Sequence, residues 1–261
     1  MHFEPLGDYE DEAPRIQSYL NEAYGQSEQT IDILEAGCGR FWDFRELKFP
    51  YRLTGIDLDA EALRLRKDEA RDLHVAIHGD LTRAEFAPGS FDVVYSSYVL
   101  EHVSGVEPLI LNFCRWLRPG GVLCVRIPDG NSAFSTITRM TPHWFHVFYY
   151  RWILGYENAG RPGCLPYPTY FDPPVSLDGM ERFAHLNGLE PVRRYRTAVQ
   201  RMSGSRGLAV RAAVGAVRLL SLRHRTSAHH DPTLILRKPR VDDVYPLPDA
   251  ELTGLAQLSP A

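Results

Sequence analysis

The stretch Ile33-Leu34-Glu35-Ala36-Gly37-Cys38-Gly39, with Asp57 following 20 residues after Gly37, decides the fold of this 261-residue chain. Apolar residues from Ile31 to Leu34 predict a buried strand, and the glycines let the backbone turn sharply and approach a ligand. Asp57 ends a second apolar run that begins at Leu53. In doubly wound sheets a carboxylate at this place accepts hydrogen bonds from ribose hydroxyls. The two segments therefore predict a nucleotide-type cofactor site.

The loop lacks the third glycine of a dinucleotide-binding fingerprint. That glycine would stand at position 42, where a helix must pack closely behind a pyrophosphate, and this chain has Trp42 there. The loop therefore fits a cofactor without a pyrophosphate. S-adenosylmethionine, an adenosine joined through a sulfonium to an amino acid, is the obvious one.

Further segments follow in an order typical of alternating strands and helices. Asp80, after the short apolar run from Val75 to Ile77, stands where a carboxylate can receive an adenine amino group. Phe91 to Ser97 predicts a fourth strand that ends in small polar residues. Leu117 to Val125 contains a helix end, a Pro-Gly-Gly turn and a fifth strand. This alternation predicts βαβ units and a mostly parallel sheet, which binds ligands at the carboxyl ends of its strands.

In order and spacing, residues 30 to 128 are similar to class I S-adenosylmethionine-dependent methyltransferases of the type 11 kind. The resemblance implies a Rossmann-like, doubly wound, mostly parallel seven-stranded α/β sheet with an antiparallel last strand. It implies S-adenosyl-L-methionine as cofactor and S-adenosyl-L-homocysteine as product. The residues expected to bind the cofactor are Glu35, Gly37, Cys38, Gly39, Asp57, Leu58, Asp80, Leu81, Ser96 and Ser97. Phe41 departs from the family, which usually has a glycine there; its ring either closes the methionine end of the pocket or stands near the substrate.

Composition bounds the organisation of the chain. A length of 261 residues with 44% hydrophobic content suits a single domain, 1–261, with elaborations. A formal net charge of −4 argues against a protein whose main partner is nucleic acid. The four cysteines show no metal-ligand spacing, so we expect no metal site and reduced thiols. Residues 1–14 show no signal-peptide pattern, which favours a cytoplasmic location.

The first residues precede the cofactor loop. Residues 1–12 are acidic and predict a loose segment, and Ala13 to Tyr24 has helical periodicity. The resemblance implies that residues 1–28 form a cap helix over the cofactor. Arg15 or Tyr19 can reach the cofactor carboxylate from such a helix, although packing or exposure to solvent is favoured for both.

Residues 129–175 form an insertion after the fifth strand that is crowded with aromatic side chains, histidines, prolines and glycines. Residues 141–152 predict a helix with Pro142 in its first turn, and residues 158–174 predict a loop. The resemblance implies that the insertion is the substrate lid. Trp144, Phe148 and Trp152 recur at helical spacing, so this stripe either docks the helix on the core or faces the substrate. The substrate-side candidates are Phe41, Tyr98, Glu101, Trp144, Tyr149, Tyr150, Tyr167 and Tyr170.

Outside these regions the patterns are simpler. Ala60 to Leu73 predicts an exposed crossover helix whose charges form a solvated face. Val175 to Asn187 predicts a helix, Leu189 to Tyr195 a sixth strand, and Thr233 to Leu236 a last strand, which the resemblance places antiparallel beside the sixth.

An arginine-rich segment lies between the last two predicted strands. Residues 201–225 hold six arginines and no acid, and residues 208–222 predict a helix too short to span a bilayer. Binding to an anionic membrane surface is possible. Packing on the domain or on a second subunit is favoured, so the chain is expected to be a monomer or a homodimer. The tail at 241–261 is expected to be flexible.

Methyl transfer from a sulfonium is an in-line displacement that needs positioning and exclusion of water. A hydroxyl or ammonium acceptor also needs a base, and His102 leads, followed by His143 and His146. A neutral amine needs none, and His102 can equally be a histidine bonded to local backbone. Three hypotheses stand: O- or N-methylation of a small organic substrate, methylation of a lipid-linked or macromolecular acceptor, and a non-methylating use of the sulfonium. The first is favoured because an aromatic lid suits an enclosed organic substrate.

Overall fold

A single twisted sheet forms the centre of the computed structural model, which describes residues 4–6, 12–153, 155–161, 166–198, 215 and 230–240. The strands are β1 (Glu4–Leu6), β2 (Ile31–Ala36), β3 (Tyr51–Asp57), β4 (Val75–His78), β5 (Phe91–Ser97), β6 (Leu117–Arg126), β7 (Glu190–Ala198) and β8 (His230–Arg237). Their order in the sheet is β1-β7-β8-β6-β5-β2-β3-β4. Only β8 runs antiparallel to its neighbours, β6 and β7. The predicted Rossmann-like sheet with an antiparallel last strand is thus confirmed.

One strand was not predicted. The structure adds β1 to the seven expected strands, in a segment that the acidic sequence marked as loose. β1 pairs in parallel with the edge strand β7, with Glu4 opposite Tyr195. The local sequence did not predict β1, because this strand depends on hydrogen bonds to β7, which lies almost 200 residues away in the chain.

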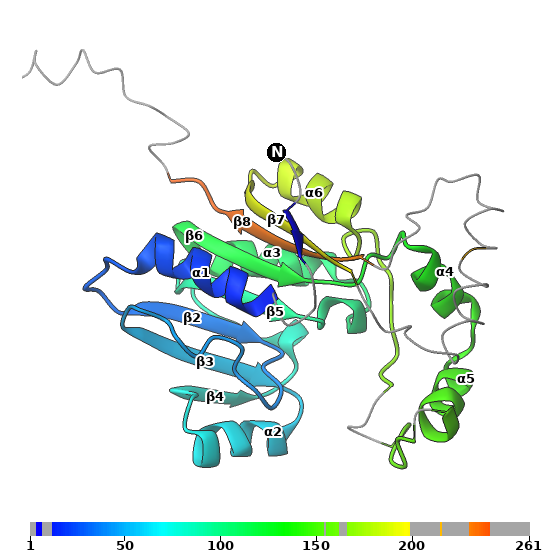
Figure 1. Ribbon diagram of the computed structural model, residues 1–261. Helices are drawn as coiled ribbons and strands as arrows, with labels where there is room; N and C mark the ends of the chain where they lie inside the picture. The colour runs from blue at the N-terminus through cyan, green and yellow to red at the C-terminus, as the bar shows by residue number, and fades with distance from the viewer. Residues whose placement is uncertain are drawn as a thin grey trace, which may run out of the picture.

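Helices cover both faces of the sheet (Figure 1). Those before β6 are α1 (Glu12–Tyr24), α2 (Ala60–Arg64), the π-helical turn η2 (Leu65–Ala70), the 3₁₀ turns η3 (Leu81–Arg83) and η4 (Leu100–His102), and α3 (Glu107–Trp116). After β6 come α4 (Ala133–Met140), α5 (His143–Phe148), the π-helical turn η5 (Tyr149–Ile153) and α6 (Leu177–Leu186).

Two apolar clusters lie on opposite faces of the sheet. Successive side chains of a strand point to opposite faces and therefore belong to different clusters. In β2, Ile33 joins the cluster that holds α1, and Leu34 joins the cluster that holds α3 and α6. In β6, Cys124 and Val125 divide in the same way. Because both faces are covered, the strands show continuous apolar runs rather than an alternating pattern.

Two predicted helices differ from the structure, and a third lies almost entirely outside the described residues. The helix expected over Ala60–Leu73 is α-helical only to Arg64 and continues as η2, which ends at Arg71 in the left-handed region at φ 55°. The helix expected over 141–152 is α5 plus η5, preceded by α4, which the sequence pattern did not reveal. The arginine-rich helix at 208–222, except for residue 215, and the tail at 241–261 lie outside the described residues.

The insertion begins after β6, at the edge where the parallel strands end, and α4 and α5 project beyond that edge (Figure 1). Its last residue, Val175, returns to this edge, where its carbonyl accepts a hydrogen bond of 3.1 Å from the Gly130 amide. β7 also ends at this edge, and the antiparallel β8 begins there. We call it the carboxyl edge. None of the described helices combines the length and the apolar content needed to cross a membrane.

Candidate cofactor and acceptor site

The glycine loop after β2 turns tightly around the end of β3. Gly37 and Gly39 have φ values of 75° and 52° in the left-handed region. A Cβ on Gly37 would stand 2.3 Å from a methyl carbon of Val99, so this position needs glycine for space as well as for conformation. The amides of Gly37 and Cys38 both donate to the carbonyl of Ile56, at 2.9 and 3.2 Å. The loop therefore lies across the carboxyl ends of β2 and β3.

Asp57 stands at the centre of this arrangement. Its Oδ2 accepts a hydrogen bond of 2.8 Å from the Gly39 amide, and its Oδ1 accepts one of 2.8 Å from the Asp59 amide. These bonds fix the carboxylate but leave each oxygen a second lone pair. Those lone pairs suit a ribose diol, and Leu58, with 71% of its surface exposed, offers an apolar contact beside it. The residues present thus fit the ribose part of S-adenosylmethionine.

Asp80 lies on the same edge, next to Asp57 in space. The amide of Gly79 donates to the Asp57 carbonyl at 3.0 Å, which joins the ends of β3 and β4. The Asp80 Oδ1 accepts hydrogen bonds from the hydroxyl and the amide of Thr82, at 2.6 and 2.9 Å. These bonds lower the pKa of Asp80, which keeps its carboxylate ionised. The following Leu81 is buried in the core beneath.

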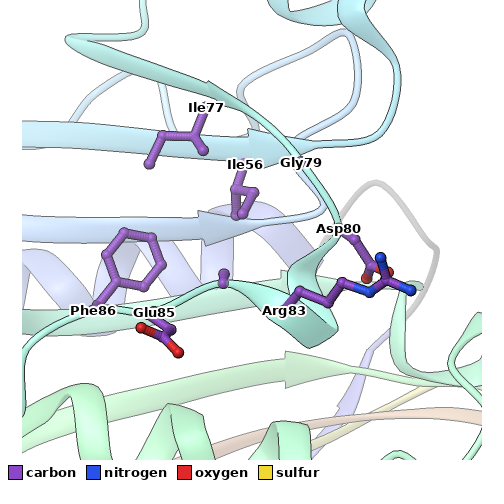
Figure 2. Close-up of a pocket in the computed structure, with 8 residues that line it drawn as sticks. Ile56, Ile77, Gly79, Asp80, Arg83, Glu85 and Phe86 are labelled. Carbon is purple, nitrogen blue, oxygen red and sulfur yellow. The ribbon is translucent and has the colours of Figure 1, made fainter.

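A cavity of about 400 Å³ adjoins Asp80 (Figure 2). Residues 79–90 carry only the short turn η3 where a crossover helix would cover the sheet, so the ends of β3 and β4 stay partly uncovered there. The lining residues are Ile56, Ile77, Gly79, Asp80, Arg83, Ala84, Glu85 and Phe86. An apolar floor with a carboxylate at its rim suits the base of a nucleoside.

A buried arginine that the sequence did not reveal supports the loop from beneath. Arg66 has no exposed surface, although Arg64 and the charged residues 67–69 are exposed. Its guanidinium donates to the carbonyls of Cys38 and Phe41 at 2.7 and 3.2 Å, and to the carboxylates of Glu35 and Asp72 at 2.8 and 2.6 Å. The expectation that all charges on this helix form a solvated face is therefore wrong for Arg66. The residues next to Arg66 in the chain do not indicate that it is buried, because Glu35 and Cys38 lie 31 and 28 positions away.

The same contacts define the role of Glu35. Burial raises the pKa of Glu35, and the guanidinium of Arg66 opposes that rise. Burial alone would lower the pKa of Arg66, but the carboxylates of Glu35 and Asp72 outweigh it and hold that pKa above its ordinary value. Because arginine keeps its proton in proteins, Arg66 stays charged and favours the ionised form of Glu35. Glu35 thus fixes Arg66, which in turn fixes the loop.

No helix follows the glycine loop in residues 40–50, all of which the structure describes. Trp42 occupies the space instead: its indole is buried and contacts the rings of Phe44 and Tyr95, at centroid distances of 4.9 and 6.2 Å. The missing third glycine is explained, since no helix packs behind the loop. Phe41 points outward, with 75% of its surface exposed at the rim.

A second buried arginine, Arg126, links β5 and β6 with the start of α1. It donates to the carboxylates of Glu12 and Asp43, at 2.6 and 3.0 Å, and to the Tyr95 hydroxyl at 3.2 Å. Its guanidinium also lies 5.3 Å from the ring centroid of Tyr98. α1 is thereby fixed at its first residue, while Tyr19 is buried in the core and Arg15 is exposed.

The end of β5 carries a strained turn. Tyr98 has φ 54°, which is uncommon for a bulky residue and is typical of functional sites. Its amide donates to the Arg126 carbonyl at 2.9 Å and its hydroxyl donates to Asp231 at 3.1 Å. Ser96 and Ser97 precede this turn, and the buried Oγ of Ser96 has no hydrogen-bond partner within the described residues.

His102 lies just beyond, where the returning part of the insertion, residues 166–172, meets the loop after β5. Its Nδ1 is 2.8 Å from the carbonyl of Pro168, and its ring lies 5.5 Å from that of Tyr167. The amide of Tyr170 donates to the Glu101 carbonyl at 2.6 Å. The sequence predicted His102, Glu101, Tyr167 and Tyr170 separately. The structure brings these four residues together at the carboxyl edge.

The protonation of His102 follows from these contacts. Burial lowers its pKa, so the ring is neutral at neutral pH. A carbonyl at Nδ1 requires that this nitrogen carry the proton, which leaves the Nε2 lone pair to accept another. Nε2 is 3.9 Å from the Glu101 carboxylate, and 30% of the His102 side chain is exposed.

The other predicted residues of the insertion lie apart from this group. His143 and His146 contact each other at 6.4 Å, and His146 Nε2 is 2.5 Å from the Thr141 hydroxyl. Tyr149 contacts Tyr150, whose ring in turn lies 5.7 Å from that of Tyr156. These contacts stay within the insertion. The alternative in which Trp144, Phe148 and Trp152 dock the helix on the core is wrong, since 69%, 48% and 70% of their surfaces are exposed.

Comparison with known proteins gives this geometry a class. Residues 34–125 match a family described as methyltransferase domain. Phosphoethanolamine N-methyltransferase 1 of Arabidopsis thaliana is 31% identical over 124 residues, which cover 44% of this chain and 25% of the plant protein. Trans-aconitate 2-methyltransferase of Deinococcus radiodurans is 33% identical over 107 residues, covering 40% of each. The matched part thus spans less than half of either relative.

A solved structure shows the same fold. Geranyl diphosphate C-methyltransferase of Streptomyces coelicolor A3(2), in complex with S-adenosyl-L-homocysteine, superposes with a TM-score of 0.52 at 16% identity, covering 86% of this chain and 80% of that one. The sheet order and the antiparallel β8 define a Rossmann-like α/β fold. Residues 34–125 are thus similar to methyltransferase domains, and the chain shares its fold with a methyltransferase of known structure.

Proposed function

We propose that this chain methylates an oxygen or nitrogen atom of a small organic acceptor, with His102 as general base. The observation that carries the proposal is the bonding between the His102 loop and residues 166–172. It holds a neutral imidazole, with its Nε2 as the hydrogen-bond acceptor, on the loop that follows β5 at the carboxyl edge. An acceptor bound beside Tyr98 and Tyr170 then lies between the base and the cofactor.

The protein's part in the reaction is to position groups and move one proton. When bound, S-adenosylmethionine supplies an activated methyl group. Asp57 holds the ribose, and the glycine loop, braced by Arg66, sets the depth of the site. His102 Nε2 takes the proton from an acceptor hydroxyl or ammonium, and the neighbouring Glu101 carboxylate stabilises the imidazolium that results.

The returning part of the insertion provides the wall of the acceptor site. Asp172 accepts hydrogen bonds from the amides of Gly105 and Val106, at 2.7 and 3.1 Å, so this wall is attached to the loop after β5 at both ends. Tyr167 and Tyr170 supply flat apolar contacts with polar tips. An enclosed acceptor surrounded by such groups is protected from water. The names of the two relatives, which refer to phosphoethanolamine and trans-aconitate, support a small acceptor.

The test uses S-adenosylmethionine labelled in its methyl group and a panel of small amines, alcohols and carboxylic acids. We expect label in a small organic product and a loss of rate of about 100-fold or more in His102→Gln, with unchanged cofactor binding by calorimetry. His185→Gln, an exposed histidine on α6, is the matched control. Label recovered only in lipid or protein, or a His102→Gln variant with full rate, contradicts the proposal.

A further inference from the structure

The largest group of exposed apolar side chains in the described part of the chain lies in one short segment. Of the thirteen exposed large hydrophobic residues in the described part of the chain, six lie between residues 140 and 156, on and around α5 and η5. They are Met140, Trp144, Phe145, Phe148, Trp152 and Tyr156. We call this surface the aromatic face. A contiguous apolar surface of this kind on a folded protein marks an interaction site.

Three rings of this face contact one another. Trp144 contacts Phe145 at a centroid distance of 6.0 Å, and Phe145 contacts Phe148 at 6.4 Å. Trp152 follows Phe148 by four residues across the π-helical turn η5, a spacing that keeps it on the same side of the helix. The residues are therefore arranged to enter one apolar environment together.

Charge identifies the kind of partner. Between residues 130 and 161 the chain has three arginines, Arg139, Arg151 and Arg161, and a single acid, Glu157. The described arginines are exposed, as is His143. Tryptophan and phenylalanine flanked by arginine are typical of surfaces that enter the headgroup region of a bilayer, where the rings are buried and the cations meet anionic lipid. A protein partner needs a matching acidic groove, whereas a lipid surface needs only these two properties.

The position of the face in the fold agrees with this partner. α4 and α5 project from the carboxyl edge (Figure 1). The connection that contains the six arginines of residues 201–225 also leaves this edge, after Ala198 at the end of β7, and returns to it at His230. Two cationic segments of the sequence thus join the sheet at the same edge.

We propose that the aromatic face docks this protein on anionic lipid surfaces, with Trp144, Phe148 and Trp152 inserted among the headgroups. Docking orients the carboxyl edge, and with it the His102 loop, toward the lipid surface. This proposal does not depend on the acceptor that the enzyme methylates. It describes where the protein lies when it acts.

The tryptophans make the test specific. The chain has four, of which Trp42 and Trp116 are buried and Trp144 and Trp152 are exposed. The full chain is mixed with vesicles of phosphatidylcholine alone or of phosphatidylcholine with phosphatidylglycerol, and both sedimentation and tryptophan emission are followed. We expect binding to the anionic vesicles, with emission shifted to shorter wavelength and quenched by brominated lipid.

The variants separate the face from other surfaces. Trp144→Ala/Phe148→Ala/Trp152→Ala changes only exposed side chains and is expected to lower partitioning by about tenfold or more. Leu186→Ala, an equally exposed apolar residue on α6, is the control and should bind as the wild type does. Absence of wild-type binding, equal binding by the triple variant, or equal binding to neutral vesicles overturns the proposal. The proposal is also overturned if the wild type forms a dimer and binds no vesicles while the triple variant is monomeric. In that case the aromatic face binds a second copy of the chain.

Discussion

The guanidinium of Arg66 donates a hydrogen bond to the Cys38 carbonyl at 2.7 Å from a position with no exposed surface. A buried charged side chain therefore supports the glycine loop from beneath. Because Glu35 lies 2.8 Å from the same guanidinium, loss of Arg66 leaves a buried carboxylate without a partner.

Replacing Arg66 should destabilise the fold. Arg66→Met is expected to lower the free energy of unfolding by about 3 to 5 kcal/mol, measured by urea titration. The double variant Arg66→Met/Glu35→Gln should recover part of that loss, because it removes the unpaired charge. Arg64→Met, which breaks only exposed ion pairs, is the control and should unfold like the wild type. Equal effects of the Arg64 and Arg66 variants would contradict the assigned role.

Asp57 should govern cofactor affinity. Asp57→Ala is expected to weaken binding of S-adenosylmethionine by about 1 to 3 kcal/mol, or about 5- to 150-fold in Kd, because a bonded carboxylate is lost. Isothermal calorimetry measures the change. Asp68→Ala removes an exposed acid from η2 and is the matched control. An unchanged Kd for Asp57→Ala would reject the ribose assignment.

The pH dependence of turnover should report on His102. Since burial lowers its pKa, a pH below the ordinary histidine value of about 6.5 is needed to protonate it. The rate is therefore expected to hold as pH falls through 6.5 and to decline only below it. Initial rates of the wild type between pH 5 and 8 test this, and the decline should be absent from the residual rate of His102→Gln. A wild-type rate that already halves above pH 6.5 would be inconsistent with a buried base.

Cys38 should be chemically inert despite its place in the cofactor loop. Burial, followed by the nearby charges of Glu35 and Asp57, raises the pKa of its thiol to about 12, so almost no thiolate exists at pH 8. Iodoacetamide at pH 8 is expected to leave Cys38 unmodified in the native protein and to alkylate it after unfolding in urea. Peptide mass spectrometry locates the label. Rapid native alkylation at Cys38 would refute this environment.

The parts of the fold that sequence predicted are those with local causes. Apolar runs such as Ile31 to Leu34 and Leu53 to Ile56 become strands, because both faces of the sheet are covered. Gly37 and Asp57 were recognised because backbone conformation and chemistry restrict the residue at each position. The cofactor follows from the same positions.

The parts that sequence missed depend on distant partners. Arg66 looks like a surface charge until Glu35, 31 positions away, is placed beside it. Arg126 and Glu12 are separated by 114 positions and meet only when α1 packs on the sheet. Trp42 indicated that the loop differs from a dinucleotide-binding loop. That its indole takes the place of a helix became visible only from its contacts with Phe44 and Tyr95.

The position of β6 in the chain has a consequence for how acceptor specificity can evolve in this architecture. The glycine loop, Asp57, Asp80, Arg66 and His102 all precede the end of β6, whereas the insertion and the arginine-rich connection both follow it. The part with the candidate cofactor residues and the part with the insertion are thus consecutive in the chain and share one sheet. Recombination near Arg126 can exchange the second part while the first stays intact, so new acceptors are open to this architecture without redesign of methyl-donor binding.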